Sequence, residues 1–570
     1  MKPETETFKI ERIIKELQEP ACYQHPVETV RVIQTHVSCV FLTGAFAYKV
    51  KKPVNFGFLD YGTLERRCFF CEQELRLNQR LCPDIYLNVV PLTVVDGRLQ
   101  VGGDGTPVEW AVRMQQMDDT DLLSARLEAD TINLTQIERI AQVLAEFHDH
   151  AQSGPAIRAF GRPEAVTRVI AGTLRDMDTV AGNAISARAR RDIRASLENF
   201  WLREADLLCR RIQAGAIRDC HGDLRAQNIC LDKRFAGGIQ VFDCIEFNNA
   251  FRYIDTAADL AYLVMDLDLA GRADMRQCLI NTYQQAAEDS DLEKILPFYQ
   301  TYRACVRANI ARLAAAEQEV AEPEREAQQE LAAAAYDLAW CYAGRRKRPA
   351  LLITTGLSAS GKSRLAWELC RRLPAVLLSS DHIRKELAGL GATERLSPAQ
   401  YTAAHRAAVY AELRRRAALS LAHGEHVILD ATFLSEHERA TTAGLAQAQD
   451  AEFWVLECRC PDAVIRRRLA SRRSDPNGSD AYLSDAYLPV YEEQLRNFQP
   501  PASPAPEGGR DSYHITINTN QPASSAVHGV VRHFLSPPEA EGPPREPAQA
   551  EGHLAQRSHA QRKSPSKKAP

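Results

Sequence analysis

The chain has 570 residues, of which 45% are apolar and 25% charged, and its net charge is -4. This composition is typical of a globular protein, and the near-neutral charge argues against a dedicated nucleic-acid or membrane-surface protein. No stretch reaches the roughly 20 apolar residues needed to cross a bilayer, and the charged segment 1–17 lacks a signal-peptide core. We therefore expect a cytoplasmic protein without a membrane segment.

The first 345 residues begin with strand patterns and continue, from about residue 120, with helical ones. Strands followed by helices predict an α+β domain over 1–345. The predicted elements are a hairpin over 37–52 turned at Gly44, a helix over 69–81, a hairpin over 85–101 turned at Asp96 and Gly97, and an Ala- and Glu-rich helix over 314–345.

Residues 346–534 change to short apolar runs that alternate with helical patterns, as a parallel α/β sheet requires. A basic run at 344–349 marks the predicted domain boundary. Residues 535–570 are rich in Pro, Ala, Glu and Lys, which predicts a disordered tail. The strands are predicted at 350–356, 375–380, 426–432, 452–458 and 513–519.

A glycine-rich loop, GLSASGKS, follows the first of these strands and precedes a helix, which is the required context for the pattern G-x-x-x-x-G-K-[ST]. Its glycines allow backbone N–H groups to surround phosphates, Lys362 would reach the β- and γ-phosphates, and Ser363 would ligate Mg²⁺. The loop therefore predicts binding of ATP or GTP with Mg²⁺. Its residues are Gly356, Leu357, Ser358, Ala359, Ser360, Gly361, Lys362 and Ser363.

Two carboxylates and several arginines extend this predicted site. Asp430 ends an apolar strand, where it can hold the metal; a helix-capping aspartate is the alternative. Asp381 can accept a proton from an attacking hydroxyl and Arg384 can hold an acidic or phosphoryl group, unless they are an N-cap and a surface arginine. An arginine-rich helix can close over the phosphates as a lid or remain a solvated face. Its members are Arg466, Arg467, Arg468, Arg472 and Arg473.

A second constellation, HGDLRAQN, begins at His221, and VFDCIEF follows about fifteen residues after Asn228. Asp223 can orient and deprotonate an acceptor hydroxyl, while Asn228 and Asp243 can each supply an oxygen to Mg²⁺. Each residue alone is weak evidence, but the order and spacing of the two motifs predict a second phosphotransfer centre.

These motifs carry two family resemblances. Residues 350–520 resemble the small P-loop kinases, such as phage polynucleotide kinase, zeta toxins and gluconate kinase. That resemblance implies that Asp381 is the general base and that Arg384 contacts phosphate.

Most of 25–330 resembles the aminoglycoside phosphotransferase and choline kinase family, which implies a protein-kinase-like fold. The resemblance further implies a strand lysine that binds the α- and β-phosphates. Lys49 is the best candidate and Lys51 the neighbour, with Glu74 or Glu72 as partner. Only Gly44 stands where protein kinases have a glycine-rich loop, and no acidic antibiotic pocket is evident.

The sequence thus predicts an ATP- and Mg²⁺-dependent phosphotransferase with two centres acting on hydroxylated small molecules. A nucleotide-binding regulatory protein with one inactive centre is an alternative. A 5′-hydroxyl nucleic-acid kinase is a second alternative, which the near-neutral charge disfavours. The acceptors, the choice of ATP or GTP and the oligomeric state are left open by the sequence.

Overall fold

A computed structural model describes residues 10–535 apart from 58, 318–320, 345–347, 392–393, 395, 397–401, 475–487 and 502–511. The predicted tail lies outside the described residues from 536 onward. The division predicted after residue 345 stays a prediction, because 345–347 are not described. Among the described helices, none combines the length and apolarity needed to cross a bilayer.

The N-terminal part opens with a six-stranded antiparallel sheet of order β1-β2-β3-β6-β4-β5. Both predicted hairpins are confirmed: β2 pairs with β3 around Gly44, and β4 pairs with β5. Asp96 and Gly97 have φ of 52° and 78°, as a two-residue hairpin turn of type I′ requires. The strands are β1 (Arg31–Gln34), β2 (Ser38–Leu42), β3 (Phe46–Lys51), β4 (Tyr86–Val95), β5 (Arg98–Val101) and β6 (Pro107–Gln115).

Helix α2 (Leu64–Asn78) covers the sheet and starts at the N-cap Thr63, whose side chain accepts a hydrogen bond from Arg66 N. The helical layer follows. The helix predicted over 314–345 is confirmed only from Glu322 to Ala343, as α13, because 314 and 315 end the preceding helix. The further helices of the N-terminal part are α1 (Ile10–Glu16), α3 (Leu123–Glu128), α4 (Leu134–His150), α5 (Pro155–Arg158), α6 (Pro163–Val180), α7 (Ala187–Arg203), α8 (Ala205–Gln213), α9 (Asn249–Arg252), α10 (Thr256–Leu269), α11 (Ala273–Ala286), α12 (Leu292–Ala315) and α13 (Glu322–Ala343).

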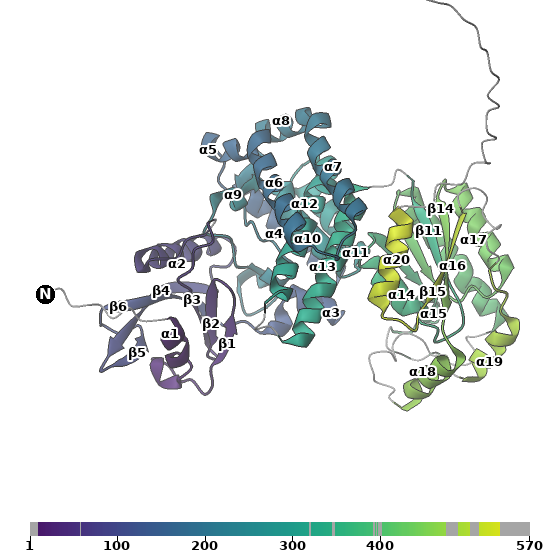
Figure 1. Ribbon diagram of the computed structural model, residues 1–570, viewed down its shortest axis with the longest axis horizontal. Coiled ribbons are helices and arrows are strands. Elements are labelled where there is room, and N and C mark those ends of the chain that lie inside the picture. Colours follow the sequence, from purple (N-terminus) through teal and green to yellow (C-terminus); the bar gives the residue numbers. More distant parts are fainter. Residues whose placement is uncertain are drawn as a thin grey trace, which may run out of the picture.

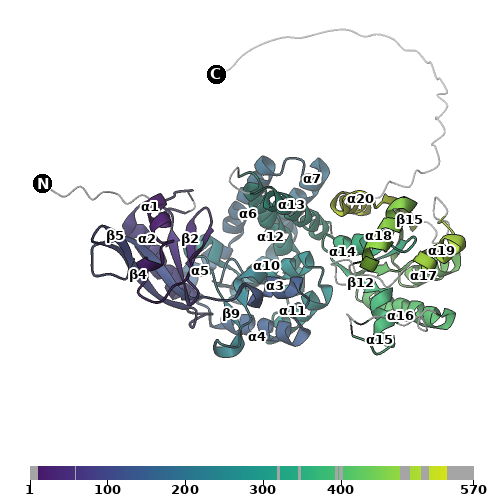
Figure 2. The ribbon, with the colours of Figure 1, turned by 90° about the horizontal axis from the view of Figure 1, so that it is seen from below.

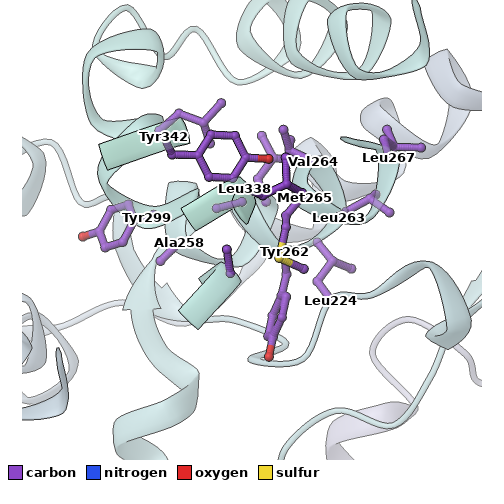
Figure 3. Close-up of a cluster of buried hydrophobic side chains, with 14 of the residues drawn as sticks. Leu224, Ala258, Tyr262, Leu263, Val264, Met265, Leu267, Tyr299, Leu338 and Tyr342 are labelled. Atoms are coloured by element: carbon purple, nitrogen blue, oxygen red, sulfur yellow. The ribbon is translucent and has the colours of Figure 1, made fainter. Parts of the chain in front are cut away.

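Helix α10 lies at the centre of this layer and is buried along nearly its whole length. Its apolar side chains pack against those of α12 and α13, with Tyr262, Leu263 and Met265 among them (Figure 3). Four short strands precede the helix in the chain, and the second predicted motif lies on and between them. They are β7 (Ile217–Asp219), β8 (Ile229–Cys230), β9 (Gln240–Val241) and β10 (Tyr253–Asp255).

The C-terminal part is a five-stranded sheet of order β12-β13-β11-β14-β15, and every described pairing in it is parallel. All five predicted strands are confirmed. Side chains alternate between two apolar layers, one against α14 and α20 and the other against α16 and α17. The strands are β11 (Ala350–Thr355), β12 (Ala375–Ser379), β13 (His426–Asp430), β14 (Glu452–Arg459) and β15 (Ser512–Asn518). The helices are α14 (Lys362–Cys370), α15 (Ser380–Leu387), α16 (Ala403–Ala422), α17 (Glu436–Ala448), α18 (Asp462–Ser474), α19 (Leu488–Asn497) and α20 (Ala523–Leu535).

The two parts meet through the helical layer, which lies between the antiparallel and the parallel sheet in both views (Figures 1 and 2). A buried ion pair joins Arg372 Nη1 to Asp337 Oδ2 at 3.2 Å, and His528 Nδ1 lies 3.2 Å from the other carboxylate oxygen. Arg371 Nε donates to Leu269 O at 2.8 Å. The chain therefore combines a protein-kinase-like α+β part with an α/β P-loop part, which confirms the predicted fold class.

Candidate active sites

The glycine-rich loop connects β11 to α14 and has the backbone shape that its sequence predicts. Gly356 and Gly361 have φ of +139° and +94°, a region that favours glycine. A Cβ at Gly356 would lie 2.7 Å from Cys458 O, so a side chain there would collide with the backbone of β14. Lys362 Nζ donates to Leu357 O at 2.8 Å, which folds the lysine over the loop at the start of α14.

A pocket of about 550 Å³ opens over this loop. It gathers most residues that the sequence assigned to the C-terminal site, although they come from four separate elements. The predicted residues that line it are Ser358, Ala359, Gly361, Lys362, Ser363, Asp381, Arg384, Asp430 and Arg468. Gly356, Leu357 and Ser360 lie on the other side of the loop, along a second, smaller hollow.

The oxygen ligands near the N-terminus of α14 fit a magnesium ion. Asp430, at the end of β13, is buried and hydrogen-bonded to Ser363, and burial raises the pKa of its carboxyl. Lys362 opposes that rise. Carboxylate and hydroxyl oxygens are ligands that Mg²⁺ prefers, and the adjacent helix N-terminus with Lys362 suits phosphate.

Asp381 and Arg384 lie in the first turn and a half of α15 and form an ion pair. Arg406 and Tyr410 of α16 and Glu438 of α17 also line the pocket. No motif marks these three residues, and only the packing of α16 and α17 beside β13 brings them to the pocket.

The arginine-rich helix α18 contributes unequally to the site. Arg468 Nη1 donates to Ala359 O at 3.2 Å and Nη2 to Thr519 O at 3.0 Å, which ties the helix to the loop. Arg466 is exposed and pairs with Asp462, and Arg467 is also exposed. The side chains of the two later arginines, 472 and 473, lie outside the described residues, as does the loop that follows.

One residue of the N-terminal part reaches this pocket. Glu330 of α13 lines it together with Ala523 and Ala526 of α20. Glu330 and these α20 residues are almost two hundred positions apart, so no local sequence pattern predicts that they line the same pocket.

The N-terminal motifs meet at the edge between the antiparallel sheet and the helical layer. Lys49 Nζ lies 2.7 Å from Glu74 Oε1 and 2.6 Å from Asp243 Oδ1. Lys51 Nζ lies 2.6 Å from Glu74 Oε2 and also pairs with Glu246. Both lysines thus share Glu74, whereas Glu72 is exposed on the outer face of α2.

Lys49 is the lysine of this pair that faces the aspartate of the VFDCIEF motif. Burial lowers its pKa, but the carboxylates of Asp243 and Glu74 raise the pKa well above the usual value, so the ammonium stays charged. Burial also opposes ionisation of Asp243, and Lys49 nevertheless lowers the pKa of that carboxyl. The Asp243 side chain is 45% exposed, which leaves it accessible to a ligand.

Two residues of the HGDLRAQN motif are joined by direct hydrogen bonds. Asn228 Nδ2 donates to Asp223 O at 2.9 Å and to Asp223 Oδ2 at 3.1 Å. Because the amide nitrogen faces Asp223, Oδ1 is the atom that Asn228 can offer to a cation. With Asp243, this oxygen fits the ligand preference of Mg²⁺.

Asp259 of α10 holds the start of this loop. Its carboxylate accepts hydrogen bonds from His221 N and Gly222 N, both at 2.8 Å, and lies 3.2 Å from His148 Nε2. Burial raises its pKa, but the hydrogen bond and charge of His148, followed by those of His221, lower it to about 2. Gly222 has φ of +89°, and a Cβ there would lie 2.8 Å from Phe251 O, so only glycine fits.

Three further residues beside Asp223 carry no motif. Arg225 Nη1 lies 3.8 Å from Asp223 Oδ2, and Asp266 Oδ2 accepts a hydrogen bond from Ala226 N at 2.9 Å. Burial raises the pKa of Asp266 to about 6, although Arg225 opposes that rise. Tyr262 packs next to this loop from α10.

Several known proteins are similar to this chain. Residues 351–501 match the family model described as AAA domain. Among solved structures, aminoglycoside 2'-phosphotransferase-IIIa is 13% identical and covers 55% of this chain and 94% of its own, with a TM-score of 0.32. A choline/ethanolamine kinase family protein from Mesorhizobium loti is 12% identical and covers 59% and 98%, with a TM-score of 0.33. A gluconokinase from Sinorhizobium meliloti 1021 is 19% identical and covers 33% and 92%, with a TM-score of 0.23.

Two curated mycobacterial relatives match a larger share of the chain. They are Uncharacterized protein Rv2004c of Mycobacterium tuberculosis and Uncharacterized protein Mb2027c of Mycobacterium bovis. Each is 31% identical over 476 residues, which are 82% of this chain and 91% of the relative. The protein therefore belongs to the same family as these mycobacterial proteins, with a protein-kinase-like N-terminal part and a P-loop C-terminal part.

Proposed function

We propose that the protein is an ATP- and Mg²⁺-dependent phosphotransferase with two kinase centres that act on hydroxyl groups of small molecules. The observation that carries the proposal is the convergence of Lys362, Ser363, Asp381 and Asp430 on one pocket above the glycine-rich loop. The kinase-like folds of both parts support this class of reaction.

In the proposed C-terminal centre, Lys362 and the loop N–H groups bind the phosphates, and Ser363 and Asp430 hold Mg²⁺. Bound Mg²⁺ neutralises charge on the phosphate oxygens. Asp381 accepts the proton of the acceptor hydroxyl, and Arg384 both orients Asp381 and faces the pocket. A bond forms between the acceptor oxygen and the γ-phosphorus, the bond to the β-phosphate oxygen breaks, and ADP leaves.

The proposed N-terminal centre uses the same chemistry with different residues. Asp223 is the base, and the hydrogen bond from Asn228 fixes its carboxylate. Lys49, held by Glu74, binds the α- and β-phosphates. Asn228 Oδ1 and Asp243 are the oxygen ligands for Mg²⁺.

The test uses the full-length protein and variants that silence one centre at a time. Transfer of labelled γ-phosphate is measured with sugars, aminoglycosides, choline, nucleosides and 5′-hydroxyl oligonucleotides. We expect Lys362→Ala to remove one set of products, Asp223→Asn to remove the other, and the double variant to remove both. The Asp223→Asn variant should still bind nucleotide, as measured by equilibrium dialysis.

The same assay separates the alternatives. Transfer that persists in the double variant contradicts the assignment of both centres. Transfer confined to 5′-hydroxyl oligonucleotides indicates a nucleic-acid kinase. Nucleotide binding that depends on Lys362 without transfer to any acceptor indicates a regulatory protein.

A further inference from the structure

Two buried arginines, Arg225 beside Asp223 and Arg303 over the ring of Tyr262, each have a guanidinium nitrogen for which the described residues provide no hydrogen-bond acceptor. These atoms are Nε of Arg225 and Nη2 of Arg303. The two residues are only 9% and 5% exposed. An unused donor on a buried cation is costly, because water cannot replace the missing partner, and it therefore points to a ligand.

Arg225 faces the same space as the proposed base. It lies two residues after Asp223 in the chain, and its Nη1 is 3.8 Å from Asp223 Oδ2. Its Nη2 donates to Gln227 Oε1 at 2.5 Å, which fixes the plane of the guanidinium. The Asp223 side chain is 23% exposed, so this space is open to an acceptor from solvent.

Arg303 extends from helix α12 to the ring of Tyr262. Its Nε donates to Ala258 O at 2.9 Å, and its Cζ lies 4.6 Å from the centre of the Tyr262 ring. The Tyr262 ring lies beside Leu224, which separates Asp223 from Arg225 in the chain, and it extends away from the apolar cluster with its hydroxyl outermost (Figure 3).

Three charged groups influence the hydroxyl of Tyr262. Burial raises the pKa of its hydroxyl and Asp223 raises it further, whereas Arg303 and Arg225 lower it. Tyr262 therefore interacts electrostatically with the proposed base and with both arginines. The neighbouring carboxyl, Asp266, accepts the N–H of Ala226 and is deeply buried; burial raises its pKa, and the charge of Arg225 opposes that rise.

We propose that the N-terminal centre takes a hydroxylated acceptor that carries an anionic group, such as a carboxylate, phosphate or sulfate, bound by Arg225 and Arg303. The inference rests on the proposed function in that Asp223 accepts the proton of the acceptor hydroxyl. A planar guanidinium with parallel N–H donors matches the oxygens of these anions. The acceptor hydroxyl then lies at Asp223 while its anionic group lies toward α12.

The first test measures binding and does not depend on turnover. Inorganic sulfate is titrated by calorimetry into the full-length protein, with both nucleotide sites saturated by a non-hydrolysable ATP analogue and Mg²⁺. We expect Arg303→Gln to weaken sulfate binding at least about tenfold, since hydrogen bonds to charged groups typically have this worth. Arg312→Gln is the matched control: it lies on the same helix, but its guanidinium donates to Val180 O, and sulfate binding should not change.

Arg303→Lys separates the effect of charge from the effect of donor geometry, because lysine keeps the positive charge but lacks the planar guanidinium donors. It should restore part of the sulfate affinity, and thermal unfolding of each variant checks that the fold is retained. Sulfate binding that is undetectable in the wild type, or equal in the wild type and Arg303→Gln, overturns the proposal.

The second test compares three acceptors that share a diol and differ in charge: glycerate, glycerol and 3-amino-1,2-propanediol. It uses the Lys362→Ala protein, so that only the N-terminal centre contributes. We expect kcat/KM to be at least about tenfold higher for glycerate, and Arg303→Gln to remove that preference. A preference for the neutral or cationic diol overturns the inference but leaves the proposed function intact. Transfer that Asp223→Asn does not affect refutes the proposed function, while the sulfate result still stands on its own.

Discussion

The carboxylate of Asp259 is expected to hold the catalytic loop of the N-terminal centre in place. In Asp259→Asn, one oxygen becomes an NH₂ group that faces a backbone N–H, so at least one of the two 2.8 Å hydrogen bonds is lost. A hydrogen bond to a charged group contributes about 1.5–3 kcal/mol, and the new donor–donor contact adds to the loss. We expect local stability around His221 and Gly222 to fall by about 2–4 kcal/mol.

The pKa of Asp259 shows how the stabilisation by this carboxylate depends on pH. Its value of about 2 lies below the ordinary 3.8, which corresponds to about 2 kcal/mol of stabilisation of the ionised form in the folded protein. Because the folded pKa is the lower one, this stabilisation is complete above about pH 4 and is lost as the pH falls toward 2. The largest contributions that favour the ionised form come from His148, followed by His221.

Hydrogen exchange of the peptide that spans 217–224 measures the effect locally. We expect exchange in Asp259→Asn to be faster by about 30- to 700-fold near neutral pH, with a loss of transfer that depends on Asp223. Asp149→Asn is the control, because its side chain is 76% exposed and its loss should change stability by less than about 0.5 kcal/mol. Exchange within twofold of the wild type in Asp259→Asn would refute the role given to this carboxylate.

Three further changes probe other contacts. Gly222→Ala should destabilise the catalytic loop by more than about 2 kcal/mol, measured by exchange of the same peptide, because its Cβ would collide with Phe251 O. Arg372→Met should lower the melting temperature of the full chain, since removing one partner of a buried ion pair costs about 3–5 kcal/mol. Glu74→Gln should weaken nucleotide binding at the N-terminal centre, measured by equilibrium dialysis in the Lys362→Ala protein, because both neighbouring lysines lose their shared carboxylate.

Each of these changes has a control in the chain. Gly44 has a φ of +92°, nearly that of Gly222, but nothing lies within 4 Å of a Cβ built there. Gly44→Ala therefore measures the backbone strain without the collision. Arg348→Met removes an exposed pair and should cost less than about 1 kcal/mol. Glu72→Gln changes an exposed carboxylate of the same helix and should leave nucleotide affinity unchanged. Equal effects of a change and its control would contradict the reason given for it.

The sequence predicted elements well where the pattern is local. The five strands of the parallel sheet follow from apolar runs bounded by helical segments, and the hairpin turns at Gly44 and at Asp96-Gly97 follow from residues that tolerate positive φ. The grouping of Asp381 and Asp430 near the glycine-rich loop was also predictable. Parallel strands end at one edge of a sheet, so residues that follow them converge there.

Residues whose importance depends on distant packing were not predictable. The sequence left Glu74 and Glu72 as equal candidates because they differ only in the face of the helix, which the fold decides. Arg303 reaches Tyr262 only because α12 packs on α10, and Glu330 reaches the C-terminal pocket only because α13 lies beside α20. Such contacts join positions far apart in the chain, and no spacing rule records them.

The contact between α10 and the end of α14 makes the two centres poor candidates for separate expression. If the chain were divided at 344–349, Arg372 would lose its partner Asp337 and the carbonyl of Leu269 would lose its donor Arg371. Each fragment would then expose polar groups that are buried in the full chain. Gly271 packs closely against the same surface, because a Cβ there would lie 2.9 Å from Cys370 Sγ. The two parts therefore share a packed polar interface. Transfer of either centre to another protein scaffold requires that the residues of this interface be transferred with it.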